Sequence, residues 1–280
     1  MMSDKKNRTT ITNTMITTGG IQKMHTSLTG DNAIYQMPIG NNLVPMNELI
    51  GQEISLTFNG EITCSNCGTT TRKSYSQGYC FPCCRDLARC DLCIMKPETC
   101  HHHLGTCREP LWGLDNCFAP HIIYLANSSG VKVGITRKSN MPSRWIDQGA
   151  VQALPVLEVD TRLKSGQIEI ALKAFVNDKT NWRKMLKNEV DATDLIAKKQ
   201  QLLAEVSDLT TNLGAITLNN EVIKINYPVI EYPNKINSLN FDKTPEISGV
   251  LQGIKGQYLL LDTGVLNIRK FSSYNLTLTY

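Results

Sequence analysis

Ten cysteines lie between Cys64 and Cys117, and none lies elsewhere in the 280 residues. Several form Cys-x2-Cys pairs, and such a pair can sit on a tight turn that points two thiolates at one metal ion. A secreted disulfide protein is usually smaller, with cysteines spread along its loops. The N-terminus is polar and has no apolar signal-peptide core, so the sequence predicts a cytoplasmic protein whose reduced thiols hold metal.

The first predicted zinc site consists of Cys64, Cys67, Cys80 and Cys83. Twelve residues separate its two pairs, and Gly68 and Pro82 are turn residues beside them. Two such turns complete the tetrahedron that zinc prefers. A full shell of four thiolates leaves no position for water, so this zinc is predicted to be structural.

A second zinc site is predicted in the remaining cysteines, and its proposed ligands are Cys90, Cys93, Cys100 and Cys107. His101 or Cys117 can replace one of the last two, and a cross-braced arrangement uses the same residues. Cys84 is interpreted as a spare thiol. An iron–sulfur cluster is the chemical alternative, because four thiolates also suit it, but two pairs twelve residues apart favour zinc.

The regions on both sides of the cysteines have strand character. Residues 31–62 indicate strands separated by Gly-Asn and Asn-Gly turns, and their last part, Glu53–Phe58, alternates between polar and apolar residues. Residues 222–280 return to short strands punctuated by glycines. Both pieces are short, so we expect them to join in one β-unit. Residues 1–15 have little apolar content and are expected to be disordered.

The region after the cysteines predicts strands and helices in a regular order. Residues 121–126 and 131–136 indicate a hairpin, a short helix follows Pro142, and residues 153–160 form a third strand. Ser165 is expected to cap the next helix.

A longer amphipathic helix is predicted over residues 191–213. Its apolar stripe is interpreted as packing on the protein's own core, with self-association or a protein partner as the alternative. No apolar run approaches the length of about 20 residues that a membrane helix needs.

The charge of one region says more about a binding partner than the net charge of the whole chain does. The net charge of +4 falls to about zero once two four-thiolate zinc sites are included, so it neither favours nor excludes nucleic acid. Residues 118–187 are more basic, with eleven Lys or Arg against five acids. A basic module of this kind favours DNA or RNA as the partner, and the sequence does not distinguish the two.

The order of residues in this basic region resembles the GIY-YIG nuclease superfamily. The resemblance is carried by Tyr124 in H-I-I-Y-L-A, Gly134 in V-K-V-G-I-T-R, Arg144 in P-S-R-W-I-D-Q-G-A and Glu169 on the following helix. The phrases Cys100-His101, G-T-C-R and V-K-V-G-I-T-R also resemble a bacterial family that carries only a domain-of-unknown-function label. That second resemblance spans nearly the whole chain.

The nuclease resemblance implies roles for particular residues. Arg144 would steady the phosphate, Glu169 would hold Mg²⁺ or Mn²⁺, and Tyr124 would match the first-motif tyrosine. Lys132 stands where the family has its second tyrosine, and a lysine with an ordinary pKa near ~10.4 is a poor base. Lys132 is therefore expected to bind phosphate, together with Arg137, Lys138 and Arg144. Gly134 would permit close approach of a substrate backbone.

The sequence as a whole predicts an α+β protein in four sections. They are an N-terminal β-section (1–62), a double zinc-binding segment (63–117), a GIY-YIG-like module with a three-stranded antiparallel sheet (118–189), and a helix with C-terminal strands (190–280). The predicted function is zinc-stabilised nucleic-acid binding. A divalent-metal endonuclease using Tyr124, Lys132, Arg144 and Glu169 is the first alternative, and a structural adaptor is the second.

Overall fold

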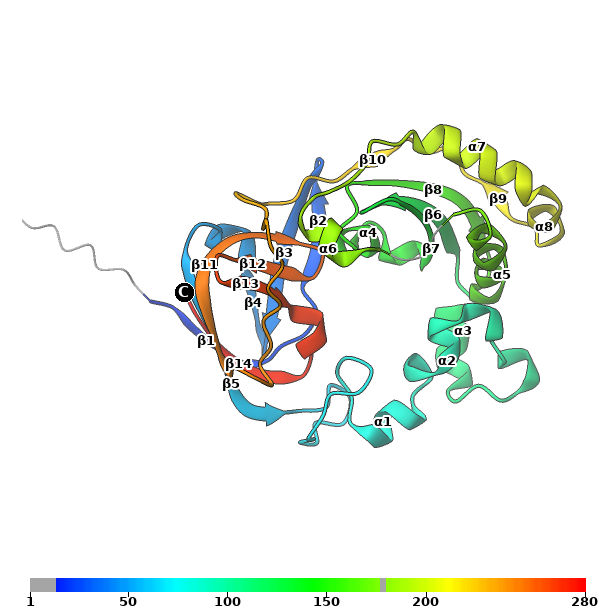
Figure 1. The fold of residues 1–280 in the computed structure, drawn as a ribbon. Coiled ribbons are helices and arrows are strands. Elements are labelled where there is room, and N and C mark those ends of the chain that lie inside the picture. The colour runs from blue at the N-terminus through cyan, green and yellow to red at the C-terminus, as the bar shows by residue number, and fades with distance from the viewer. Residues whose placement is uncertain (1–13, 177–179) are drawn as a thin grey trace, which may run out of the picture.

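The computed structural model describes residues 14–176 and 180–280, so most of the predicted disordered start lies outside the described residues. The fold is α+β with three antiparallel sheets (Figure 1). Strands from both ends of the chain form one part of the molecule. The central sheet and its helices form a second part, and the cysteine segment runs between them.

The β-unit is defined here as the six-stranded and three-stranded sheets. The six-stranded sheet joins N-terminal and C-terminal strands, as the short pieces in the sequence suggest. Its order is β1 (Ile16–Gly20), β14 (Tyr274–Thr279), β5 (Glu53–Ile62), β11 (Glu246–Lys255), β12 (Tyr258–Leu261) and β13 (Gly264–Asn267). The smaller sheet contains β2 (His25–Thr29), β3 (Asn32–Ile39) and β4 (Asn42–Pro45). Alternating side chains such as Leu276 and Leu278 are fully buried, as a strand with one covered face requires.

The central sheet follows the predicted hairpin but is larger than three strands. Its hairpin consists of β6 (His121–Asn127) and β7 (Val131–Arg137). The strand β8 (Gln152–Val159) pairs with the other edge of β6. Two short strands, β9 (Ile216–Thr217) and β10 (Ile223–Lys224), then add to β8, so the sheet has five strands. β6 is buried along its whole length because it lies between two neighbours and under covering helices.

The helices of this part differ from the predictions at their ends. The helix α5 (Arg162–Lys173) begins at Thr161, whose side chain accepts from the Lys164 amide. The prediction that Ser165 caps it was wrong, because Ser165 is a buried residue inside the first turns. Two short helices, α4 (Ser143–Asp147) and α6 (Trp182–Leu186), flank it in sequence.

The predicted helix over residues 191–213 is divided into α7 (Leu195–Glu205) and α8 (Ser207–Asn212). Asp194 caps α7 by accepting from two amides, and Val206 separates the two helices. Leu195, Leu202 and Val206 pack into the core beneath the central sheet. The apolar stripe is therefore covered within the chain, as the core interpretation predicts.

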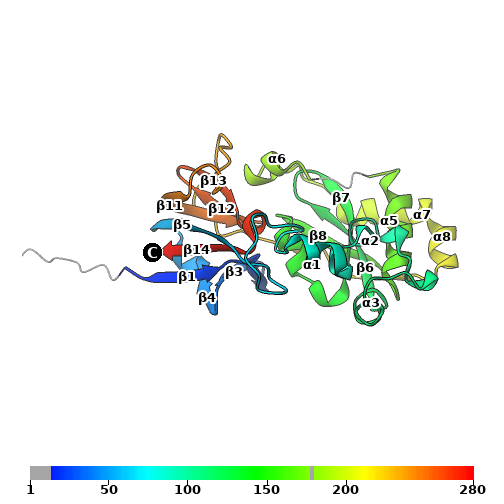
Figure 2. The same cartoon turned by 90° about the horizontal axis from the view of Figure 1, so that it is seen from below.

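The cysteine segment, residues 64–117, contains only short helices: α1 (Phe81–Asp86), α2 (Leu92–Met95) and α3 (Pro110–Cys117). It leaves β5 and runs across to the central module (Figure 2). No Leu, Ile, Val, Met, Phe, Tyr or Trp side chain is buried anywhere in it. None of the helices in the described part of the chain is long and apolar enough to span a membrane.

Candidate functional site: thiol clusters beside an arginine-lined cleft

The first four predicted ligands come together at the start of the cysteine segment. The Sγ atoms of Cys64, Cys67, Cys80 and Cys83 all lie within 4.8 Å of one another. The Gly68 amide closes the first turn on the Cys64 carbonyl at 2.9 Å, and Gly68 itself has a φ of +72° that a glycine adopts without strain. Cys80 precedes α1 and Cys83 lies within it, so Pro82 starts a helix rather than a loop. The arrangement is able to hold a metal ion such as zinc.

The four thiols differ in the pKa that their surroundings give them. Hydrogen bonds from the Thr69 hydroxyl and amide lower the pKa of Cys67 to about 6. The Asn66 amide also lowers the pKa of Cys83, but the hydrogen bond with Cys80, burial and two neighbouring thiols raise it to about 12. Crowded thiols oppose one another's ionisation, and a divalent cation among them removes that opposition.

The β-unit anchors this first cluster. Ser65 and Ser273 share a hydrogen bond between their hydroxyls at 2.7 Å, and Ser273 also donates to the Gly78 carbonyl at 2.7 Å. Ser273 lies just before β14, so the first cluster is tied to the last strand of the chain.

The later cysteines are arranged differently from the predicted second set. Cys93 lies with Asp91 and His101, the ligand atoms of the three being within 4.8 Å of one another. Cys90 instead neighbours Cys84, and burial together with the Cys84 thiol raises the pKa of Cys90 to about 11. Cys84 in turn shares a hydrogen bond with Ser76 at 3.3 Å.

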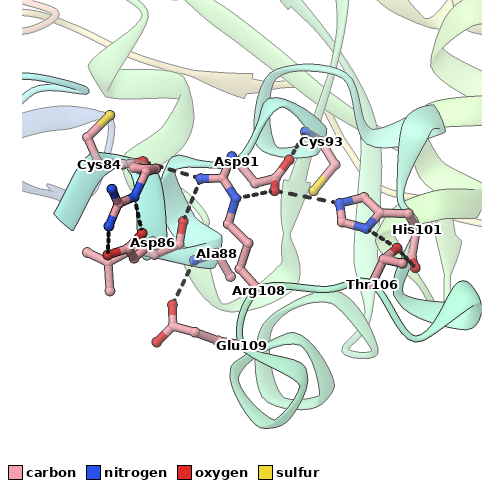
Figure 3. Close-up of polar contacts among 11 residues, drawn as sticks. Cys84, Asp86, Ala88, Asp91, Cys93, His101, Thr106, Arg108 and Glu109 are labelled. Carbon is pink, nitrogen blue, oxygen red and sulfur yellow. Dashed lines mark hydrogen bonds and ion pairs between the residues drawn. The ribbon is translucent and has the colours of Figure 1, made fainter. Parts of the chain in front are cut away.

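Polar contacts fix the shape of this later part (Figure 3). The Arg108 guanidinium pairs with Asp91 at 2.7 Å and donates to the Cys84 carbonyl at 3.2 Å. Glu109 accepts from the Ala88 amide at 2.7 Å. His101 contacts Asp91 through Nε2 at 3.6 Å and Thr106 through Nδ1 at 2.7 Å. Asp91 and His101 therefore already have polar partners in the protein.

The second anchor of the cysteine segment is α5. Arg162 donates to the Ile94 carbonyl at 2.6 Å. Gly166 lies against the short helix Pro97–Thr99, where a Cβ would come within 2.5 Å of the Glu98 nitrogen. Only a glycine permits this approach, so α5 and the cysteine segment pack backbone to backbone.

An arginine-lined cleft of about 330 Å³ opens where the three parts of the molecule meet. Trp112, Asn116, Thr136 and Asn140 contribute to its walls, and no Asp or Glu lines it. Its five arginines come from the cysteine segment, the central module and the C-terminal β-section: Arg89, Arg137, Arg144, Arg162 and Arg269.

The positive charges of these five guanidinium groups are not balanced by carboxylates of the described residues. Within the described residues, none of the five forms an ion pair with a carboxylate. Burial lowers the pKa of Arg162, and the charges of Arg144 and Arg137 lower it further. Burial and the charge of Arg144 likewise lower the pKa of Arg269. Arginines held this close together favour an anion as the occupant.

Two of the four predicted phosphate-binding residues, Arg137 and Arg144, line this cleft. Lys132 is buried and donates to the Thr180 hydroxyl, and Lys138 pairs with Glu158 at 2.9 Å. Neither lysine belongs to the cleft lining.

Among the residues taken from the nuclease resemblance, Tyr124 and Gly134 are buried in the fold, and Arg144 and Glu169 are partly exposed. Tyr124 is fully buried and donates to Gln148 at 3.1 Å. Its hydroxyl interacts electrostatically with Arg144 and Glu169. A Cβ at Gly134 would lie 2.6 Å from the Tyr124 hydroxyl, so this glycine accommodates Tyr124 rather than a substrate.

Glu169, the predicted ligand of a divalent ion, lies on α5 beside Lys173. Its carboxylate pairs with Lys173 at 3.4 Å, and it belongs to no group of potential metal ligands among the described residues. The role of Glu169 as a ligand for Mg²⁺ or Mn²⁺ stays a prediction.

Sequence reasoning missed Arg89, Arg162 and Arg269 as members of one site. Arg162 and Arg269 are 107 residues apart in the chain, and Arg269 lies in the short helix Ile268–Phe271 before β14. The only local signal was the basic excess around Arg162. The position of Arg269 depends on the pairing of the chain ends, which no motif encodes.

The model of one protein family, described as "Protein of unknown function (DUF2797)", matches residues 51–276. The match includes the whole cysteine segment and central module, and it confirms the predicted resemblance to a family of unknown function. No curated protein and no solved structure matches the sequence. The GIY-YIG resemblance stays a prediction.

Proposed function

The chain belongs to the family described as "Protein of unknown function (DUF2797)", and from the geometry of its cleft we propose that it binds DNA or RNA. The carrying observation is the convergence of five arginines on one cleft without a lining carboxylate. Arginine presents a planar fork of donors that matches phosphate oxygens. A chain of phosphates offers several such groups at once, which suits arginines contributed by three parts of the molecule.

Other cleft residues support a nucleic acid over a single phosphate. Trp112 offers an aromatic surface beside Arg89, whose guanidinium lies 6.0 Å from the ring centroid. The amide side chains of Asn116 and Asn140 also line the cleft. Aromatic rings stack on bases, and amides hydrogen-bond to base edges. In this proposal the metal-holding segment supplies one wall of the binding site.

The test is the binding of labelled single-stranded and double-stranded DNA and RNA by the zinc-loaded protein at several salt concentrations. Arg137→Ala and Arg144→Ala should each weaken binding about tenfold or more, because a hydrogen bond to a charged group contributes about 1.5–3 kcal/mol. Each should also reduce the slope of log affinity against log salt by about 1.

Lys138→Ala is the matched control, because it removes a cation from the same region that pairs with Glu158 outside the cleft. It should leave affinity nearly unchanged. Circular dichroism and zinc content show whether each variant is folded. Equal losses in Lys138→Ala and Arg144→Ala would reject the cleft as the binding site, and binding of inorganic phosphate without DNA or RNA would reject nucleic acid as the ligand.

The same mixtures with Mg²⁺ or Mn²⁺ test the endonuclease alternative. Binding alone predicts intact strands. Cleavage that is lost in Glu169→Gln but kept in Glu158→Gln would identify the nuclease activity that the resemblance implies.

A further inference from the structure

We infer that Cys93, Cys100, Cys107 and Cys117 form a second thiolate metal centre for a zinc-type divalent cation, and that Cys84 and Cys90 are not ligands. The four cysteines line one small cavity of about 10 Å³ in the later part of the cysteine segment. A volume of this size holds about one water-sized sphere, which suits a single ion and excludes a larger ligand.

Electrostatic interactions connect all four thiols. Cys93 interacts electrostatically with Cys100 and Cys117. Cys117 also interacts with Cys100 and Cys107. Cys90 is absent from the cavity lining and interacts instead with Cys84. The ten cysteines thus divide into two sets of four and one pair outside both sets.

The surrounding charges favour a centre with net negative charge. Arg162 interacts favourably with the thiols of Cys93 and Cys117, and its Nε is buried without a hydrogen-bond partner in the described part of the chain. Four thiolates around Zn²⁺ carry a net charge of about −2. Such a centre gives the buried guanidinium a countercharge that no carboxylate provides.

Asp91 and His101 are the competing ligands, since both approach Cys93. Asp91, however, caps α2 through the Cys93 amide and pairs with Arg108. His101 Nδ1 lies 2.7 Å from the Thr106 hydroxyl, and its Nε2 lies 3.6 Å from Asp91, beyond hydrogen-bond distance. A thiolate is also a softer ligand for zinc than the Asp91 carboxylate oxygen.

The second set is looser than the first. Among the described residues, Cys93, Cys100, Cys107 and Cys117 are not a group whose sulfurs all lie within 4.8 Å of one another. An ion would therefore draw these sulfurs inward to about 2.3 Å from the metal. Cys117 and Trp112 line both this cavity and the arginine-lined cleft, so the ion would also fix one wall of the cleft.

The metal content of purified full-length protein, measured by native mass spectrometry, tests the assignment. The wild type should carry two zinc ions per chain. Cys117→Ser and Cys107→Ser should each retain one, and the matched controls Cys84→Ser and Cys90→Ser should retain two. One ion in the wild type would overturn the inference. Loss of an ion in Cys90→Ser with both retained in Cys117→Ser would overturn it as well.

Two further measurements keep the inference testable if the cysteine variants do not fold. Alkylation of the zinc-loaded wild type, mapped by peptide mass, should modify Cys84 and Cys90 first and the other eight only after a chelator is added. Rapid modification of Cys93 and Cys117 before chelation would contradict it. His101→Gln should keep two ions and an unchanged Co²⁺-substituted absorption spectrum, and loss of an ion there would assign His101 instead. The metal count does not depend on nucleic-acid binding, so the two proposals fail separately.

Discussion

The β-unit and the cysteine segment are held together by different forces. In the β-unit, strands from both chain ends pack on a continuous apolar core, shared with one face of the central sheet, in which Leu56, Leu276 and Leu278 are fully buried. The cysteine segment buries no large apolar side chain and leaves Phe81, Met95 and Leu111 exposed. Burial of apolar surface contributes about 1.5–3 kcal/mol for each large side chain, and residues 64–117 lack that contribution.

The two regions are therefore stabilised in different ways, and the candidate binding site lies between them. Apolar burial stabilises the β-unit, whereas the cysteine segment has no such core, and we expect it to depend on metal and polar cross-links. The arginine-lined cleft lies between the two, with Arg269 contributed by the C-terminal β-section and Arg89 by the cysteine segment. A change in either region would therefore alter the cleft, but for different physical reasons.

Removal of metal is the change with the largest expected effect. Structural zinc contributes about 10–16 kcal/mol to the folding of small zinc domains. A chelator should therefore lower amide protection in residues 64–117 by more than about 100-fold, while the amides of β5, β11 and β14 remain protected. Hydrogen exchange with mass spectrometry measures both regions in one sample.

Addition of zinc to the chelated sample is the control, and it should restore protection. Simultaneous loss of protection in β14 would contradict the comparison, because it would show that the β-unit and the cysteine segment form one cooperative unit.

The two thiol sets also differ in how far the sequence predicts them. The first set consists of two Cys-x2-Cys turns, and each turn positions its ligands by local geometry. In the second set, six, six and nine residues separate Cys93, Cys100, Cys107 and Cys117. The Cys90-x2-Cys93 spacing suggested another local pair. The surrounding packing instead places Cys90 beside Cys84.

In the fold, too, the sequence predicts features set by local residues better than features set by packing between distant segments. The hairpin around residues 127–130 follows from a turn and two apolar runs, and the sequence predicted it correctly. The start of α5 was predicted wrongly because threonine and serine are both good helix caps, and the sequence offers Thr161 and Ser165. In the structure the Lys164 amide donates to the Thr161 side chain, so Thr161 is the cap. The added strands β9 and β10 are two residues each, too short for a pattern.

Lys255 provides a smaller test, within the β-unit itself. Its amine is fully buried at the end of β11, donates to Asn188 at 2.6 Å and lies over the rings of Tyr227 and Tyr232. Burial lowers its pKa from 10.5 to about 7. The unfolded chain therefore binds this proton more tightly than the folded protein between about pH 7 and pH 10.5.

Since the unfolded state holds more protons in this window, the contribution of Lys255 to stability rises with pH. The total change is up to about 5 kcal/mol at about 1.4 kcal/mol per pKa unit. Urea unfolding at pH 7 and pH 10 should show this rise in wild-type protein and a smaller rise in Lys255→Met. The exposed Lys243→Met is the control and should follow the wild type. An identical pH dependence in Lys255→Met would show that the buried amine does not oppose folding.

Arg108 tests whether polar cross-links replace an apolar core in the cysteine segment, and its expected effect is the smallest. It joins Asp91 to the Cys84 carbonyl and is one-third exposed, so solvent reduces its contribution. Arg108→Ala should lower the local free energy of opening by about 1–3 kcal/mol, measured by hydrogen exchange at residues 88–93 in zinc-loaded protein. Arg85→Ala removes an exposed pair with Asp86 and should leave this free energy nearly unchanged. If both variants open equally, metal alone holds the segment. If Arg108→Ala opens more, the part of the segment without buried side chains depends on its hydrogen bonds as well as on its thiolates.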